Sequence, residues 1–143
     1  MTSHICFEAL DPNKPATFSS LILNNLLREE LGFDGVVVSD SMNMHSLQKN
    51  YDSVDAAVEA LCSGVDLIML AEEHYDHDSQ YQVRQRRLIE GVQKAFLDGK
   101  IPENRIVDAI SRVRQLKGKI KNVETPSFED PTWVSSSRES AAK

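Results

Sequence analysis

The stretch GFDGVVVSDSMNM, residues 32–44, decides the fold, because three consecutive valines run up to a carboxylate, Asp40. Valines without polar alternation predict a strand covered on both faces, which is typical of a parallel sheet with helices outside it. A carboxylate at the end of such a strand acts as a nucleophile, a phosphoacceptor, a metal ligand or a cap of the following helix. Position alone favours the cap, since Asp and Ser are common turn formers at such junctions.

Two further strands are predicted, one on each side of this stretch. SHICF (3–7) is a short apolar run that ends in a polar turn containing proline, and VDLIML (65–70) is a second buried run. The centres of the three runs lie roughly 30 residues apart, the length of a βαβ unit, in which the two strands are parallel. We therefore expect three successive parallel strands.

Helices are predicted between and after these strands. The first begins at Ser19 or Ser20, both competent N-caps, and ends at Gly32 as its C-cap residue. The remaining helices are predicted over 53–62, 81–100 and 102–120. Apolar residues recur at helical spacing on one face of the first and last helices, at Leu23, Leu26, Leu27, Leu31, Ile106, Ile110, Val113 and Leu116.

Composition limits the class of protein. A chain of 143 residues, 41% hydrophobic and 27% charged, is long enough to bury one core. Its net charge of -6 does not attract nucleic acid or anionic lipid, and no run approaches the ~20 apolar residues of a membrane span. Cys6 and Cys62 lie far apart, as free thiols in a reducing compartment do. We therefore expect a cytoplasmic protein with no nucleic-acid or membrane partner.

The periodic pattern ends near Lys121. Residues 122–143 are rich in Ser, Pro and charge, a composition that predicts a tail or linker with little order. The chain is thus predicted to contain one domain, residues 1–121, followed by this tail.

The residues around Asp40 carry a family resemblance. LLREELGFDGVVVSDSMNM (26–44) resembles glycoside hydrolase family 3, especially its β-N-acetylhexosaminidase branch, which removes terminal N-acetylglucosamine. MTSHICFEALDPNKPATFSS (1–20) is similar to the family's preceding strand and loop, and AVEALCSGVDLIML (57–70) to its last barrel strand with the helix before it. DGKIPENRIVDAISRVRQLK (98–117) is similar to its closing helices, so the resemblance covers most of residues 2–118.

The resemblance implies a fold and an activity. The fold would be α/β: a partial TIM (β/α)8 barrel, formed by the last three βα units with their closing helices, whereas a complete barrel takes about 250 residues and eight strands. The activity would be retaining hydrolysis of terminal N-acetylglucosamine, with Asp40 as the nucleophile that forms a covalent glycosyl-enzyme. The implied partner is a glycan that contains N-acetylglucosamine.

Several neighbours of Asp40 are candidates for supporting roles. We expect the hydroxyls of Ser39 and Ser41 to hydrogen-bond the carboxylate and hold it ionised. His4, Met42 and Met44 are the candidates for contact with the sugar. Core packing is the favoured alternative for the two methionines, and a structural role is the alternative for His4. We expect neither a cofactor nor a bound metal ion.

The sequence departs from the family at the second catalytic group. The resemblance implies an acid/base His on a loop with a motif like KHFPGHGD, and none of the flanks of His4, His45, His74 and His77 matches it. The alternative function is therefore a catalytically incomplete fragment that binds a sugar without hydrolysis or completes another chain. Its expected partner is a second copy or the missing barrel half, which would cover strand edges left unpaired.

Other acidic patterns have weaker interpretations. A response-regulator receiver also has an Asp at a strand end, but it needs an acidic pair after its first strand, where this chain has only Glu8 and Asp11 at loose spacing. EEHYDHD (72–78) contains metal-ligand residue types, although a solvated loop is the favoured interpretation. Asp66, between apolar neighbours, is expected to hydrogen-bond a nearby backbone group.

Overall fold

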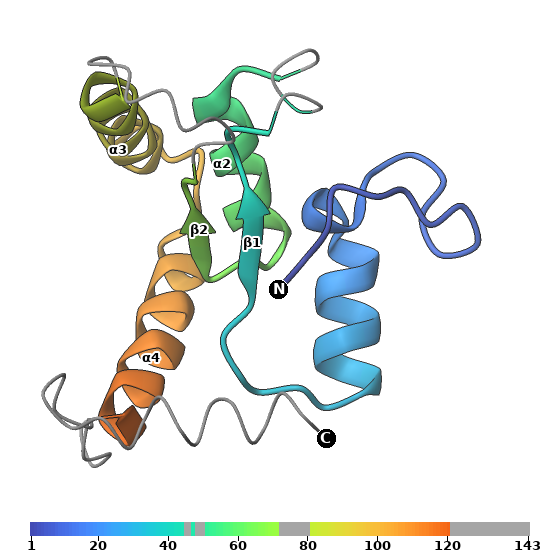
Figure 1. Ribbon diagram of the computed structural model, residues 1–143. Coiled ribbons are helices and arrows are strands. Elements are labelled where there is room, and N and C mark those ends of the chain that lie inside the picture. The colour runs from blue at the N-terminus through green and yellow to red at the C-terminus, as the bar shows by residue number, and fades with distance from the viewer. Residues whose placement is uncertain (45–46, 48–50, 72–80, 121–143) are drawn as a thin grey trace, which may run out of the picture.

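The computed structural model of the chain describes residues 1–44, 47, 51–71 and 81–120. The predicted tail, 122–143, lies outside these residues. Figure 1 shows two strands separated by a helix, with further helices before and after them. They are, in order, η1 (Ala16–Phe18), η2 (Leu21–Glu30), β1 (Val38–Ser41), α2 (Ser53–Ser63), β2 (Leu67–Met69), α3 (Tyr81–Leu97) and α4 (Glu103–Ile120).

The sheet has two parallel strands, β1 and β2. Val38 pairs with Leu67 and Ser41 pairs with Met69, with a shift of register between the two pairs. An α/β fold with parallel strands is therefore confirmed. Both strands point the same way in Figure 1, so their carboxyl ends lie at one edge of the sheet.

The predicted third strand, SHICF (3–7), is wrong, because this segment forms no strand in the structure. Thr2, the residue before this segment, donates a hydrogen bond from its N–H to the Val38 carbonyl of β1, 2.8 Å away. Backbone acceptors of the segment itself bond within the N-terminal region: the Ser3 carbonyl accepts from Thr17, and the Ile5 carbonyl accepts from the Ala16 N–H. Among the described residues, the segment therefore lacks the repeated backbone hydrogen bonds that join neighbouring strands of a sheet.

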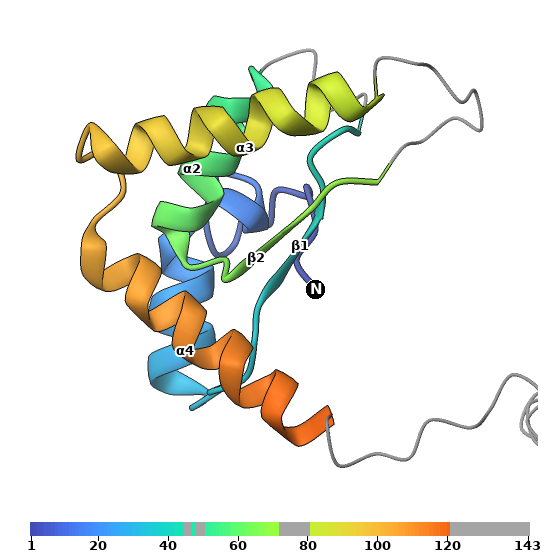
Figure 2. The same cartoon turned by 90° about the vertical axis from the view of Figure 1, so that its left-hand side faces the viewer.

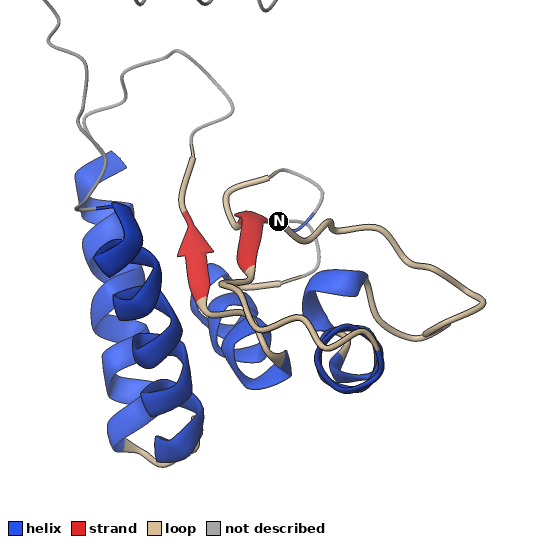
Figure 3. Cartoon of the chain, turned by 90° about the horizontal axis from the view of Figure 1, so that it is seen from below, coloured by secondary structure: helices blue, strands red, loops and turns tan. Residues whose placement is uncertain are grey.

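Helices gather on one face of the sheet. Figures 2 and 3 show α2 behind the two strands, η2 on the side of β1, and α3 with α4 on the side of β2. Along β1 burial alternates, with Ser39 and Ser41 buried and Val38 and Asp40 half-buried. The expectation of a strand covered on both faces is therefore wrong for the described residues, since they place helices on only one side of it.

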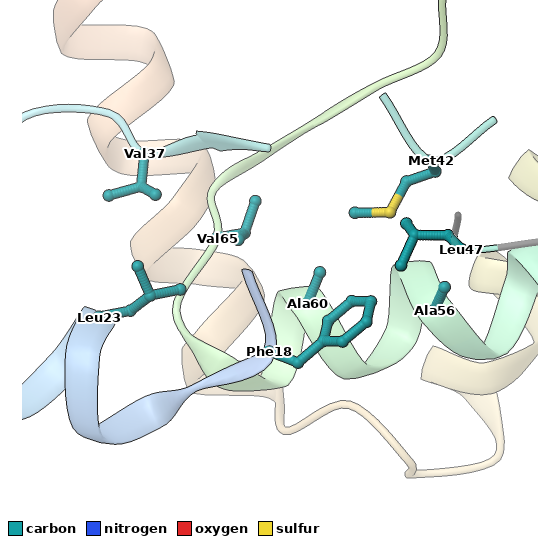
Figure 4. Close-up of a cluster of buried hydrophobic side chains, with 8 residues drawn as sticks. All are labelled: Phe18, Leu23, Val37, Met42, Leu47, Ala56, Ala60 and Val65. Carbon is teal, nitrogen blue, oxygen red and sulfur yellow. The ribbon is translucent and has the colours of Figure 1, made fainter. Parts of the chain in front are cut away.

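The main core lies between the sheet, η2 and α2. Its buried members come from every early element, and they are drawn in Figure 4: Phe18, Leu23, Val37, Met42, Leu47, Ala56, Ala60 and Val65. The small side chains of α2 let this helix approach the sheet closely. A smaller cluster of Leu61, Ala95 and Ile101 joins α2 to the later helices. Burial of these apolar side chains is the main favourable term in holding the layers together.

Local sequence explains where the helices begin and end. The Ser19 hydroxyl accepts a hydrogen bond from the Ile22 N–H, and the Asp52 carboxylate accepts one from the Val54 N–H, so both residues act as N-caps. Gly32, with φ of 64°, follows η2 as predicted, because a positive φ costs glycine little. η2 is a wider π-helix over its whole length, and at its end the Leu31 N–H bonds the carbonyl of Leu26, five residues back.

The predicted apolar faces are only partly buried. Leu31 is 68% exposed, and Ile110 and Leu116 on α4 are 45% and 42% exposed. Figure 1 shows why for α4: its later turns run beyond the amino end of β2 and meet no other described element there. Helical spacing identifies a face that can be buried, but burial depends on what packs against it.

Candidate active site at the carboxyl end of β1

Asp40 lies near the carboxyl end of β1, where the alternation along the strand places its side chain on the face opposite to that of the buried Ser39 and Ser41. Its side chain is half-buried, and its Oδ1 accepts a hydrogen bond of 2.8 Å from the Ser41 N–H. Within the described residues, the Oδ2 atom has no hydrogen-bond partner. The carboxylate is thus anchored through one oxygen, while the other is available to react or to bind.

The neighbouring serines do not support Asp40 in the expected way. The Ser39 hydroxyl accepts a hydrogen bond from the Met69 N–H, 2.9 Å away. The Ser41 hydroxyl donates to the Ala71 carbonyl (2.8 Å) and accepts from the Ala71 N–H (3.1 Å). Both hydroxyls therefore bond to β2 and the residues that follow it, because alternation along a strand directs them away from the Asp40 side chain. Among the residues that the structure describes, the carboxylate accepts a hydrogen bond from the Ser41 backbone N–H and from neither serine hydroxyl.

His4 approaches the same strand end from the N-terminal segment. Its Nε2–H donates a hydrogen bond of 3.0 Å to the Ser41 carbonyl. Its Nδ1 is buried and has no hydrogen-bond partner among the described residues, and its ring lies 6.2 Å from that of Phe18. The structure therefore brings His4 next to the residue that follows Asp40, so two of the predicted site residues meet at one place.

The two methionines lie in different surroundings. Met42 is 1% exposed and belongs to the main core, where Figure 4 shows it beside Leu47. The packing alternative therefore describes Met42 as the structure has it. Met44 is half-buried and its carbonyl accepts from the Leu47 N–H, so part of its side chain faces solvent.

Asp11 holds the loop that follows the N-terminal segment, a role that the sequence pattern did not assign. The Ser19 hydroxyl donates a 2.7 Å hydrogen bond to its Oδ2, and the Asn13 N–H donates one to its Oδ1. These bonds favour the charged form, so the Ser19 hydroxyl, followed by the Asn13 N–H, lowers the pKa of Asp11. The bond to the N–H two residues on is an Asx turn, so Asp-Pro-Asn was the available signal.

Asp66 forms the densest charged contact of the described chain, at the other end of the sheet. As predicted, it accepts from a backbone group, the Val37 N–H. It also forms ion pairs with Arg28, Arg105 and Arg112, at 2.6, 2.7 and 3.2 Å, while its own side chain is fully buried. The sequence did not reveal these arginines, because they come from η2 and α4, 38 to 46 residues away along the chain.

Metal-binding groups are absent from the part of the chain that the structure describes, where no cluster of three His, Cys, Asp or Glu side chains could hold an ion. The segment EEHYDHD (72–78) lies outside that part, as do His45, His74 and His77. None of the described helices is both long and apolar enough to cross a membrane. Cys6 and Cys62 are free thiols, as expected.

Comparisons with known proteins point to one family. The family profile described as "Glycosyl hydrolase family 3 N terminal domain" matches residues 1–116. Beta-hexosaminidase A of Pseudoalteromonas piscicida is 29% identical over 84% of this chain, and the Beta-hexosaminidase of Shewanella frigidimarina is 38% identical over 51% of it. The glycoside hydrolase family 3 beta-N-acetylglucosaminidase from Paenibacillus sp. str. FPU-7 superposes over 91% of this chain, with a TM-score of 0.75 and 36% identity.

The match covers only a part of each relative. This chain spans 22% of the Pseudoalteromonas protein, 21% of the Shewanella protein and 24% of the Paenibacillus structure. About four fifths of each relative therefore have no counterpart in the 143 residues.

Proposed function

We propose, on the premise that this chain belongs to glycosyl hydrolase family 3, that Asp40 is the nucleophile of a retaining β-N-acetylhexosaminidase. The observation that carries the proposal is the placement of Asp40 near the carboxyl end of a parallel strand, half-buried, with one oxygen anchored and the other unpaired among the described residues. Active sites of parallel α/β barrels lie at this end of the strands. The relatives named beta-hexosaminidase and beta-N-acetylglucosaminidase suggest the substrate, a glycan with terminal N-acetylglucosamine.

The chemistry proceeds in two steps. In the first, a carboxylate oxygen of Asp40 forms a bond to the anomeric carbon, the glycosidic C–O bond breaks, and a general acid gives its proton to the leaving oxygen. In the second, water attacks the anomeric carbon and gives a proton to the same residue, and Asp40 leaves as a carboxylate. Asp40 supplies the nucleophile of this scheme, and the general acid is not assigned to any residue of this chain.

We further propose that residues 1–121 are the C-terminal part of a TIM-type barrel. The two-stranded parallel sheet, its uncovered face and the small share of each relative that the chain spans support this proposal. A complementary part would extend the sheet and supply the general acid. This partner would be either the missing barrel half or a second copy of the chain.

An apolar hollow, or surface pocket, lies beside β1 and supports the association of this chain with another polypeptide. It has a volume of about 360 Å³ and lies between the N-terminal segment, η2 and the start of β1, with Phe7, Leu27, Leu31, Phe33 and Val36 in its wall. Phe7 and Phe33 are 44% and 41% exposed there. Exposed apolar side chains around a hollow are typical of a surface that contacts another polypeptide segment.

Direct contact with the sugar stays a proposal for His4, Met42 and Met44. The half-buried side chain of Met44 supports a place at the pocket wall. Met42 is buried in the core, so it would act only by packing beneath the site. A cytoplasmic location likewise stays a prediction from the sequence.

The second candidate function is a non-catalytic module that binds a sugar or completes another chain. The observation that favours it is the uncovered face of the sheet, since a carboxylate on such a face can accept hydrogen bonds from sugar hydroxyls without a general acid nearby. This function requires no chemistry at Asp40.

One experiment separates the two functions. Hydrolysis of a fluorogenic N-acetyl-β-glucosaminide is measured with the purified chain, with the Asp40→Asn variant, and with Asp34→Asn as a control at an exposed carboxylate close by. The proposed function expects hydrolysis that Asp40→Asn reduces at least about 10³-fold, the scale of losing a catalytic nucleophile, and that Asp34→Asn leaves unchanged. Folded protein without hydrolysis that still binds the glycan, measured by calorimetry, would favour the second function.

A further inference from the structure

We propose that Ser41 is a positioning residue for the Asp40 carboxylate, and that His4 supports this role through its bond to the Ser41 carbonyl. The role rests on the proposed function of Asp40 as nucleophile. Its basis is the number of chain segments that meet at this one serine, which is 5% exposed.

Every polar group of Ser41 has a partner. Its N–H donates to the Asp40 Oδ1 (2.8 Å), and its carbonyl accepts from the His4 Nε2–H (3.0 Å). Its hydroxyl donates to the Ala71 carbonyl and accepts from the N–H groups of Ala71 and Asn43, at 2.8, 3.1 and 3.2 Å. One residue therefore connects the N-terminal segment, β1, the turn after β1 and the residue that follows Leu70.

The hydroxyl adds a link next to an irregularity in the sheet. The register of β1 against β2 shifts between Val38 and Ser41, and after the shift Ser41 pairs with Met69, whose carbonyl accepts from the Met42 N–H. The Ser41 hydroxyl bonds to both backbone groups of Ala71 there. The direction of the Ser41 N–H, and with it the position of the Asp40 Oδ1, depends on this link.

His4 holds the next peptide group along the chain, between Ser41 and Met42, through the Ser41 carbonyl. In a neutral imidazole, the bond from Nε2–H to the Ser41 carbonyl selects the tautomer in which Nδ1 is an acceptor. This Nδ1 is buried and has no partner among the described residues. A buried polar atom that is left unpaired is unfavourable, and such costs are found at sites where geometry serves function.

Ser39 provides a matched control on the same strand. Its side chain is also fully buried, and its hydroxyl also accepts a backbone N–H, that of Met69. Neither the Asp40 carboxylate nor His4 is bonded to it in the described structure. Loss of the Ser39 hydroxyl therefore removes a comparable link between β1 and β2 without touching the proposed positioning contacts.

The first test needs no activity. Amide hydrogen exchange is measured by NMR at residue 41 and at the core residue Ala60, for the wild type and for the Ser41→Ala, Ser41→Thr and Ser39→Ala variants. The ratio of the exchange rate at residue 41 to that at Ala60 removes the effect of a change in global stability. We expect this ratio to rise about tenfold in Ser41→Ala, and to stay within about threefold of the wild-type value in Ser41→Thr and Ser39→Ala.

Two outcomes decide the positioning role. An equal rise in Ser41→Ala and Ser39→Ala would overturn it, because the hydroxyl would then only hold the strands together. The expected difference, with rescue by threonine, would support it. If Ser41→Ala does not fold, His4→Leu removes the other contact from outside the strand, and it should raise the same ratio; an unchanged ratio would overturn the role.

The second test uses hydrolysis by the same proteins, assayed on the fluorogenic substrate. We expect Ser41→Ala to lower kcat by about 10²-fold with little change in KM, because a displaced nucleophile affects the chemical step more than binding. A larger change in KM than in kcat would overturn the positioning role. Absence of hydrolysis by the folded wild type would contradict the proposed function instead, while the exchange ratio still decides whether Ser41 holds the peptide that anchors Asp40.

Discussion

At the amino end of the β1–β2 pair, Asp66 is a fully buried carboxylate bonded to three arginines and a backbone N–H. At the carboxyl end, Asp40 is a half-buried carboxylate with a single backbone N–H as its partner among the described residues. The two aspartates lie on neighbouring strands of one short sheet, yet their surroundings differ in charge, in burial and in the number of bonds.

The difference separates a structural carboxylate from one that is available for chemistry. A carboxylate has about four lone-pair sites, and four hydrogen bonds occupy those of Asp66, with Arg105 and Arg112 on Oδ1 and Arg28 with the Val37 N–H on Oδ2. Asp66 thereby joins η2, β1 and α4 but has no capacity for a further ligand. Asp40 has one occupied site among the described residues, which is consistent with the proposed role of its carboxylate as a nucleophile.

The largest predicted effect contrasts these two residues directly. Asp66→Ala leaves three partly buried guanidinium groups without their shared anion, and we expect it to lower the free energy of unfolding by about 3–5 kcal/mol. Asp40→Ala removes one hydrogen bond, so we expect a loss of only about 0.5–1.5 kcal/mol. Urea denaturation followed by circular dichroism measures both. Equal losses would mean that the two carboxylates share one structural role.

A second prediction concerns the apolar packing that stabilises the carboxyl end of the β1–β2 pair. Met42→Ala leaves a cavity beneath the site in the main core, and we expect it to cost about 2–5 kcal/mol in the same assay. The half-buried Met44 serves as the control, and Met44→Ala should cost clearly less, about 1 kcal/mol. A reversed order would contradict the assignment of Met42 to the core.

A third prediction compares buried charge with charge at the surface. Asp52 caps α2 and also pairs with Arg87, but both side chains are largely exposed. We expect Asp52→Ala to cost about 1 kcal/mol, through loss of the cap. Arg87→Ala should cost no more than about 0.5 kcal/mol, because water and salt screen the exposed pair. Denaturation at low and high salt checks this, since only the ion pair should respond to salt.

The smallest predicted effect concerns pH and Asp11. Its pKa is lowered from its ordinary value of 3.8, so the folded chain binds fewer protons here than the unfolded chain does. The stabilisation by Asp11 is therefore complete above the unfolded pKa, and it is lost as the pH falls below about 3.8 through the lower folded pKa. Asp11→Asn should flatten the dependence of the unfolding free energy on pH in that acidic window, measured by urea titrations at stepped pH. An unchanged slope would contradict this assignment.

Much of the local structure could be predicted from residue patterns. The helices over η2, α2, α3 and α4, the Gly32 stop and the two parallel strands follow from helical spacing, caps and runs of apolar residues, all of which act over a few neighbouring positions. The strand predicted at 3–7 is a different case, because the structure does not form it. Its apolar residues suit a strand, but its backbone acceptors bond residues 16 and 17, a competition that no local pattern reveals.

In the candidate site, too, one feature could be predicted from the sequence and others depend on the folded chain. Asp40 was found from a strand that stops at a carboxylate, and the order of residues alone predicts that position. The direction of the serine hydroxyls, the contact of His4 with Ser41 and the three arginines around Asp66 required the folded chain. Each joins residues that are between 30 and 46 positions apart along the chain.

The sequence by itself determined which short segments coil or extend, where they stop, and that one carboxylate lies at a strand end. These properties depend on backbone preferences and on the spacing of apolar side chains over a few residues. Only the tertiary structure decided which carboxylate is neutralised and which stays available, because that depends on donors brought together from distant segments. The ion pairs of Asp66 and the single bond of Asp40 are therefore properties of the packed layers, and not of either residue's neighbours in the chain.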